Sequence, residues 1–174
     1  MVRDGNIGMA DVQIRPATLE DLVHLTAIYN HYVADGAITF DIDPCTPDER
    51  RSWYAAHTTG PGHRLLVAED AARIVGYAGT GPFRAKRAYE TTVESTIYLA
   101  PDALGRGVGS ALYTALFAAL AGEDVHRAVA GITLPNPASL ALHSRFGFRE
   151  VGVFRENGRK LGRYWDVMWL EREL

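Results

Sequence analysis

A strand that leads into a glycine-rich turn and then a helix constrains this sequence most. Residues 91–99 are predicted to be a strand that stops before Pro101, glycines stand at 105, 107 and 109, and an apolar helical pattern follows. Glycine lets the backbone come close to an anion, and the start of a helix carries about half a positive charge. The unit requires a fold with both strands and helices and predicts a pyrophosphate site. Glycines before a helix can also be needed for close packing, so the turn alone does not decide between a pyrophosphate site and a packing role.

Composition limits the remaining possibilities. A chain of 174 residues, 47% hydrophobic and 22% charged, is sized for one domain with its own core. A net charge of −3 argues against a nucleic-acid partner, because such binding neutralises many phosphates. No stretch approaches the ~20 apolar residues of a membrane span, and the single Cys45 cannot form an internal disulfide. We expect a soluble cytoplasmic protein without a membrane partner.

The domain organisation is simple. Residues 1–10 are polar and precede a second methionine, Met9, so we expect a flexible N-terminal tail or an upstream start. Residues 11–174 contain no repeat, no low-complexity segment and no break that resembles a linker. They are predicted to form a single domain.

Periodicity and capping residues predict the elements of the first half. Thr18 is predicted to cap a helix that ends near Gly36, and Thr46 to cap a second helix through a capping box with Glu49. Strands are expected at residues 12–16, 63–69 and 73–80, with a turn at 70–72 and an interruption at Gly81–Pro82.

The second half continues the alternation. After the glycine turn we expect a helix that stops at Gly122, a strand at 127–133, a helix at 137–146, and a closing hairpin of 148–156 and 161–170 around Asn157–Gly158. The fold class is therefore α/β in the α+β sense, with a central and partly antiparallel sheet.

A second segment supports the glycine turn. Residues 136–148 place Asn136 after a strand, then a helix, then an aromatic-glycine-aromatic exit. Together the two segments resemble the GNAT superfamily of N-acetyltransferases, and the resemblance runs from Val12 to the C-terminus. It implies a mixed, mostly antiparallel sheet that splays at an acetyl-CoA site and is flanked by helices, with acetyl-CoA as co-substrate.

Five short segments in order, residues 28–31, 76–78, 81–84, 91–99 and 165–167, resemble the phosphinothricin and methionine sulfoximine acetyltransferase group. This resemblance implies acetyl transfer to the α-amino group of a small amino-acid analogue, namely phosphinothricin, methionine sulfoximine or methionine sulfone, by a homodimer. A protein or peptide N-acetyltransferase and a CoA-binding regulator without catalysis remain as alternatives.

The expected cofactor contacts lie along the strand, the turn and the second segment. The superfamily usually has Gln or Arg three places before the central glycine, whereas this chain has Leu104 there and its positive charge at Arg106. Backbone amides should therefore provide most of the anion binding. The residues predicted to bind cofactor are Ile97, Tyr98, Leu99, Gly105, Arg106, Gly107, Val108, Gly109, Ser110, Asn136 and Ser139. Asn136 before Pro137 is equally a helix cap.

Two residues are predicted to be catalytic. Glu94 lies in mid-strand, where burial raises the pKa of a carboxylate, and it is the candidate general base, with an exposed strand face or a structural ion pair as the alternatives. His143 occupies the place where the superfamily often has a tyrosine, and it is the candidate acid for the departing thiolate, with a structural role as the alternative. The resemblance implies that a backbone N–H near Leu99 meets the oxyanion.

The acceptor needs planar cationic donors for its oxygens. Arg84 is the first choice, because a guanidinium binds such oxygens in a bidentate manner, and Phe83 and Tyr89 share its loop. Phe40 resembles part of a substrate-side loop that the partner subunit can supply in this family. We assign no metal ligands.

Overall fold

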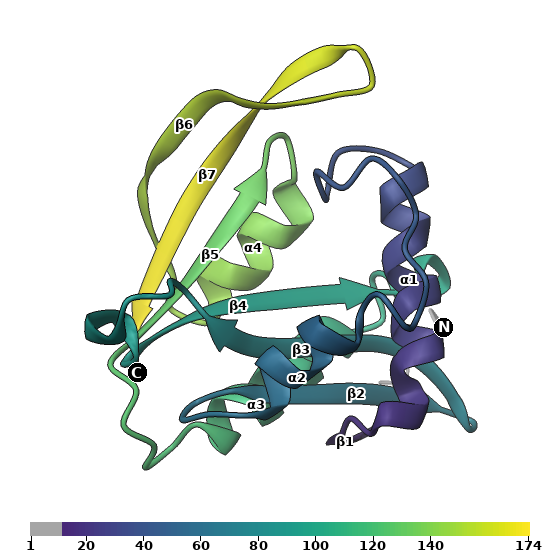
Figure 1. The fold of residues 1–174 in the computed structure, drawn as a ribbon, viewed down its shortest axis with the longest axis vertical. Coiled ribbons are helices and arrows are strands. Elements are labelled where there is room, and N and C mark those ends of the chain that lie inside the picture. The colour runs from purple at the N-terminus through teal and green to yellow at the C-terminus, as the bar shows by residue number, and fades with distance from the viewer. Residues whose placement is uncertain (1–11) are drawn as a thin grey trace, which may run out of the picture.

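A computed structural model describes residues 12–174, so the tail predicted for residues 1–10 lies outside the described part of the chain. A seven-stranded sheet in the order β1-β2-β3-β4-β5-β7-β6 forms its centre (Figure 1). Neighbouring strands are antiparallel except for the parallel pair β4 and β5. The strands are β1 (Gln13–Pro16), β2 (Arg64–Asp70), β3 (Arg73–Pro82), β4 (Thr92–Leu99), β5 (Arg127–Thr133), β6 (Arg149–Lys160) and β7 (Arg163–Glu173). The predicted mixed, mostly antiparallel sheet is confirmed.

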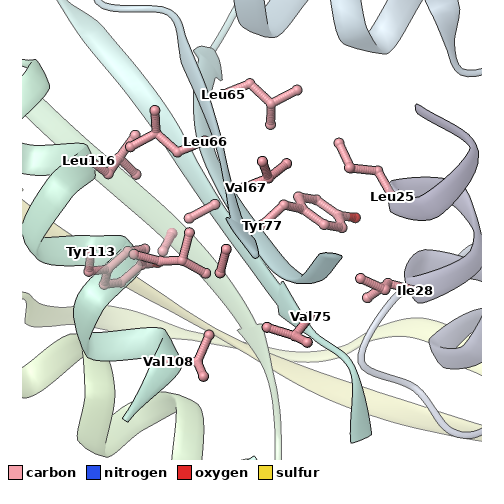
Figure 2. Close-up of a cluster of buried hydrophobic side chains, with 14 of the residues drawn as sticks. Leu25, Ile28, Leu65, Leu66, Val67, Val75, Tyr77, Val108, Tyr113 and Leu116 are labelled. Atoms are coloured by element: carbon pink, nitrogen blue, oxygen red, sulfur yellow. The ribbon is translucent and has the colours of Figure 1, made fainter. Parts of the chain in front are cut away.

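Helices cover the sheet unevenly. The four α-helices are α1 (Leu22–Ala34), α2 (Arg51–Thr58), α3 (Val108–Ala119) and α4 (Pro137–Arg145). Figure 2 shows Leu25 and Ile28 of α1 on one side of the central strands and Tyr113 and Leu116 of α3 on the other. Tyr77 of β3 is fully buried between these layers. The helices α1 and α2 thus leave the face of β5, β7 and β6 on their side of the sheet without a helical cover (Figure 1).

The predicted capping box between Thr46 and Glu49 forms, and the predicted cap Thr18 forms a capping box with Asp21. Asp21 accepts a hydrogen bond from the Thr18 backbone N–H at 2.7 Å, and Glu49 accepts one from the Thr46 backbone N–H at 2.7 Å. A short 3₁₀ turn, Leu19–Asp21, precedes α1, and α2 begins at Arg51 rather than directly after the box. Capping residues therefore mark where each helical region starts better than where the α-helix itself begins.

The interruption predicted at Gly81–Pro82 is wrong, because β3 continues through both residues. Gly81 pairs with Glu94 and Pro82 with Val93 in the ladder between β3 and β4. Pro82 is the last residue of its strand, where a missing N–H costs little. The ring of His57 from α2 lies over Gly81, with Nε2 only 2.8 Å from the place of a Cβ, so a larger residue has no room there.

The hairpin turn predicted at Asn157–Gly158 is also wrong. The turn lies at Leu161 and Gly162, which have φ values of 54° and 76°, and Asn157–Gly158 falls inside β6. The register between β6 and β7 shifts between Phe154 and Gly158, so Asn157–Gly158 lies in a bulge-like irregularity of the strand rather than in the hairpin turn. The ring of Phe40 occupies the space that a side chain at Gly158 would need. Contact with a distant loop therefore overrides local turn chemistry.

Candidate active site

The two parallel strands of the sheet separate halfway along their length. Strands β4 and β5 pair only at Thr92–Arg127, Val93–Ala128 and Glu94–Val129, although β4 runs on to Leu99 and β5 to Thr133. The Ser95 hydroxyl donates to the Val129 carbonyl at 3.3 Å, just where the backbone ladder ends. Glu94 is thus the last paired residue before the splay.

The edge of β4 that faces the splay carries hydrogen-bonding groups for a ligand. Ala100 N–H donates to the Val75 carbonyl on the β3 side at 2.8 Å, and antiparallel pairing alternates, so Ile97 and Leu99 direct their backbone groups away from β3. Tyr32 of α1 donates its hydroxyl to the Leu99 carbonyl at 2.7 Å. That bond occupies the carbonyl and leaves the Leu99 N–H on the open edge. Sequence reasoning missed Tyr32, which looked like one more core aromatic.

A narrow slot of about 60 Å³ fills the splay. It is lined by residues 95–98 of β4 and 130–133 of β5, with Asn136, Ser139 and His143 of the α4 region and Ile38. The predicted pantetheine strand, the predicted cofactor residues on α4 and the predicted acid therefore lie around one cavity.

The glycine turn lies at the start of α3, which follows β4 in the chain. Gly105 and Gly107 have φ values of 73° and 82°, in the left-handed region, and a Cβ at either would meet no atom within 4 Å. Backbone conformation rather than packing therefore requires glycine there. Gly109 differs, because a Cβ would lie 3.2 Å from Leu142 Cδ2 of α4. Ala111 N–H bonds to the Gly107 carbonyl at 3.1 Å, and the amides before it at the helix start have no place in the helical ladder.

Arginines surround this turn in an arrangement that the sequence did not predict. Arg106 donates to Asp70 at the end of β2 at 2.6 Å, so its guanidinium is already paired within the protein. Arg145 of α4, which sequence reasoning missed, donates to the Ser110 hydroxyl at 3.2 Å. Leu104 is 55% exposed and contributes no polar group. Apart from the backbone amides, the positive group next to the start of α3 is therefore Arg145. Arg106 instead links the turn to β2.

Glu94 is half-buried on the face of β4 that also carries Thr96 and Tyr98. Burial raises the pKa of its carboxyl above the ordinary value, and no ion pair within residues 12–174 involves it. The structural ion pair that the sequence left open does not form in the described part of the chain.

His143 is almost fully buried, at 3% exposure. Its Nδ1 lies 2.8 Å from the Ser139 carbonyl, and its Nε2 lies 2.8 Å from the hydroxyl of Tyr113 on α3. Only a protonated nitrogen can donate to a carbonyl, so Nδ1 carries the hydrogen and Nε2 accepts from Tyr113. Burial lowers the pKa of His143, so the ring is neutral at pH 7. Sequence reasoning missed Tyr113, which occupies an ordinary core position of its helix.

Asn136 is the N-cap of α4, and its side chain accepts from the Ser139 N–H at 3.1 Å. The capping interpretation is therefore confirmed. Asn136 and Ser139 also line the slot, which keeps both available for cofactor contact.

The predicted substrate residues divide between two places. Phe83 and Arg84 line an apolar cavity of about 500 Å³ on the uncovered sheet face, together with Trp169 and Phe154. The Arg84 guanidinium lies over the rings of Phe83 and Tyr89, at 4.9 and 5.6 Å from their centroids. Phe40 instead packs against Gly158 of β6 and lines neither this cavity nor the slot.

A second cavity, of about 320 Å³, opens on the same face of β4 as Glu94. It is lined by Tyr29, Asp41, Cys45, Glu49, Arg50, Trp53, Thr96 and Tyr98. Arg50 was not among the predicted site residues, because it precedes α2 in a run of charged residues that is typical of a solvated helix start.

None of the helices in residues 12–174 has the length and hydropathy needed to cross a bilayer. In the same residues no group of three or more His, Cys, Asp and Glu side chains is arranged to hold a metal ion.

Comparison with known proteins agrees with this geometry. The acetyltransferase (GNAT) domain family matches residues 14–169. A phosphinothricin N-acetyltransferase from Streptomyces coelicolor is 59% identical over 169 residues, which cover 96% of this chain and 99% of that protein. An L-methionine sulfoximine/L-methionine sulfone acetyltransferase from Pseudomonas paraeruginosa is 35% identical, with coverage of 92% and 94%.

Solved structures agree as well. A GNAT superfamily phosphinothricin acetyltransferase from Sinorhizobium meliloti, in complex with acetyl-CoA, superposes with a TM-score of 0.88 at 34% identity, covering 94% of this chain and 88% of that one. A Salmonella typhimurium protein solved with its cofactor acetyl-CoA also has a TM-score of 0.88, at 32% identity and 94% coverage of both chains. The resemblance inferred from residues 105–110 and 136–148 is confirmed, and the chain belongs to the GNAT family of acetyltransferases.

Proposed function

We propose that the protein transfers the acetyl group of acetyl-CoA to the α-amino group of a small amino-acid analogue: phosphinothricin, methionine sulfoximine or methionine sulfone. The observation that carries the proposal is the splay between β4 and β5, because Glu94 stands where it begins and the glycine turn follows where β4 ends. The names of the relatives support this substrate class.

In this proposal the pyrophosphate of acetyl-CoA lies at residues 105–110 and the pantetheine lies in the slot. Backbone N–H groups of the turn and the N-terminus of α3 attract the phosphates. Arg145 adds a positive charge beside Ser110. Ile97 pairs with a pantetheine amide through its free backbone groups, as an added strand would, and the Leu99 N–H is left for the acetyl oxygen.

Glu94 acts as the general base. Its carboxylate takes a proton from the α-ammonium group, directly or through a water molecule, and the neutral amine nitrogen then attacks the thioester carbon. The pKa of an α-amino group in peptides is roughly 7.7–8.0, so a modest base is sufficient to deprotonate it near neutral pH. The raised pKa of Glu94 supports this role, because it brings the pKa of the base closer to that of the amine.

The Leu99 N–H stabilises the oxyanion that forms as the C–N bond is made. The attacking nitrogen then loses its second proton to water, the C–S bond breaks to give the amide, and the thiolate leaves. The acid role of His143 stays a prediction, and its geometry weighs against it, because a neutral ring with a hydrogen only on Nδ1 has no proton to give at Nε2. A thiol of ordinary acidity, with a pKa of about 8.5 for free cysteine, takes its proton from water. We assign to His143 the positioning of α4 against Tyr113.

Arg84 is the proposed partner for the α-carboxylate of the acceptor, with Phe83 and Tyr89 as the rings that hold its guanidinium. Phe40 acts on the substrate side through its loop, which also carries Asp41. These assignments follow from the family resemblance and from the chemistry of a planar guanidinium.

Release of free CoA thiol tests the function. Mixing the protein with acetyl-CoA and methionine sulfone, methionine sulfoximine or phosphinothricin should release thiol, which a thiol-reactive chromophore detects, and mass spectrometry should find the N-acetyl product. Ordinary amino acids and a short peptide with a free N-terminus serve as comparison acceptors. Thiol release with the peptide alone would favour a peptide N-acetyltransferase, and binding of acetyl-CoA without thiol release from any acceptor would favour a regulator.

We also propose that the protein is a homodimer. The uncovered sheet face supports this, because Val151 and Phe154 are 61% and 56% exposed beside the cavity that contains Arg84. A second copy would cover this apolar surface. Sedimentation equilibrium should give twice the chain mass, and Phe154→Asp should shift it toward the monomer. A wild-type protein that sediments as a monomer at micromolar concentration would contradict the proposal.

A further inference from the structure

The cavity next to Tyr98 contains an arginine in an unusual environment. Arg50 is only 6% exposed, and its guanidinium lies over two aromatic rings, 4.2 Å from the centroid of Tyr29 and 4.0 Å from that of Trp53. Contact with two rings restrains the position of the group. Its edge is therefore the part that can donate hydrogen bonds into the cavity.

Arg50 lacks the partners that a buried charge normally has. In the part of the chain that the structure describes, no carboxylate lies within 4 Å of its guanidinium nitrogens. Its hydrogen bonds there are long, 3.4 Å to the Leu25 carbonyl and 3.5 Å to the Tyr77 hydroxyl. A guanidinium has five N–H groups, so most of its donor capacity is unused. Buried charges are ordinarily paired, and an unpaired one is costly to keep for packing alone.

The cavity is held open by contacts in its wall. Asn30 of α1 donates to the Cys45 carbonyl at 2.7 Å and accepts from the Cys45 N–H at 3.0 Å, which fixes the loop opposite Tyr98. The two carboxylates of the wall are bound elsewhere, since Asp41 accepts from the Tyr29 hydroxyl at 2.6 Å and Glu49 accepts from Thr46. They lower the net charge of the cavity without pairing with Arg50. The cavity therefore suits a group with strongly polar oxygens more than one with several negative charges.

The position of the cavity relates it to Glu94. Glu94, Thr96 and Tyr98 alternate onto one face of β4, and the last two line the cavity. At about 3.3 Å per residue, Thr96 is only about 7 Å along the strand from Glu94, so the cavity begins within the length of an amino acid from the base. An acceptor with its amine at Glu94 can therefore extend its side-chain end past Thr96 into the cavity.

From these observations we propose that Arg50 recognises the side-chain end of the acceptor by donating from its guanidinium edge to the oxygens of a tetrahedral sulfur or phosphorus centre. The aromatic rings of Tyr29, Trp53 and Tyr98 contact the methylene groups that lead to that centre. This assignment rests on the proposed function, and it leaves the α-carboxylate to Arg84. Arg50 is thus a specificity residue that separates oxygenated acceptors from apolar amino acids of the same length.

Methionine sulfone and methionine test this directly, because they share the amine, the carboxylate and the chain and differ only in the two sulfur oxygens. Arg50→Met should lower the ratio of kcat/KM for the sulfone to kcat/KM for methionine by about 10- to 100-fold, the usual range for a lost charge-assisted bond. The loss should appear as a higher KM for the sulfone. Arg50→Gln keeps some hydrogen-bonding capacity, so its ratio should lie between those of the wild type and Arg50→Met. Because the ratio is independent of the amount of folded enzyme, it also separates recognition from stability.

Arg51→Met is the matched control, since Arg51 is its exposed neighbour and pairs with Asp48 at 2.8 Å, and it should leave the ratio unchanged. An unchanged ratio in both Arg50 variants would overturn the proposal while leaving the acetyltransferase function intact. A wild-type protein that acetylates none of methionine sulfone, methionine sulfoximine and phosphinothricin would instead overturn the proposed function. If Arg50→Met fails to fold, the ratio in Arg50→Gln decides.

Discussion

Replacement of Glu94 by glutamine is expected to lower kcat by about 100-fold or more, while the KM for acetyl-CoA changes less than about twofold. Glutamine keeps the size of the side chain and removes its ability to take a proton. Steady-state thiol release across a pH series measures the effect. In the wild type the rate should fall with decreasing pH as Glu94 becomes protonated, and burial raises its pKa, so this fall begins above the ordinary range of a glutamate. The variant should lose that acid limb.

The same substitution has an opposite effect on stability. Since the pKa of Glu94 is higher in the folded chain than in the unfolded one, its contribution to folding is present below about pH 4.3 and is lost as the pH rises through the folded pKa. Glu94→Gln removes this loss, so the variant should resist urea at pH 7 at least as well as the wild type. Glu90→Gln, at an exposed acid that forms an ion pair with Arg87, should leave turnover unchanged. A Glu94→Gln enzyme that is both active and less stable would return Glu94 to a structural role.

Most of the sheet could be predicted because its strands keep a strict pattern and end at clear signals. The strand at 127–133 was predicted with the bounds of β5, and the helix predicted at 137–146 ends one residue later than α4. The hairpin turn was misplaced because Asn157–Gly158 is the stronger local signal, and only the contact with Phe40 shows why it stays within a strand. Such long-range contacts leave no mark in a short window of sequence.

The site could be predicted only in part for the same reason. Sequence motifs predicted the glycine turn, Glu94 and His143, since each of them is recognised by its neighbours in the sequence. The splay itself depends on pairing that stops between β4 and β5, and no residue type signals a missing hydrogen bond. Arg106 looked free for a phosphate until Asp70, distant in sequence, was found beside it. Arg50 looked like one more charge at a helix start, although the aromatic rings around it come from separate elements.

Replacement of Gly107 by alanine is expected to raise the KM for acetyl-CoA about tenfold with little change in kcat. Gly107 has a φ of 82° at the N-cap of α3, and an L-residue pays roughly 1–2 kcal/mol to remain there. The turn can avoid this cost only by rotating its N–H groups away from the phosphates. Because a Cβ at Gly107 would meet no protein atom within 4 Å, a clash with the protein cannot explain the effect. Initial rates at varied acetyl-CoA measure it.

Gly122 supplies the control for backbone strain, because it has a φ of 86° just beyond the other end of α3 and equally open surroundings. Gly122→Ala should lower the free energy of unfolding by a similar amount, about 1 kcal/mol, and leave the KM for acetyl-CoA unchanged. If both variants raised the KM alike, general loosening of α3 would account for the result. If neither did, the amides of the turn would not be the main phosphate contacts, and the side chain of Arg145 would have to provide that binding instead.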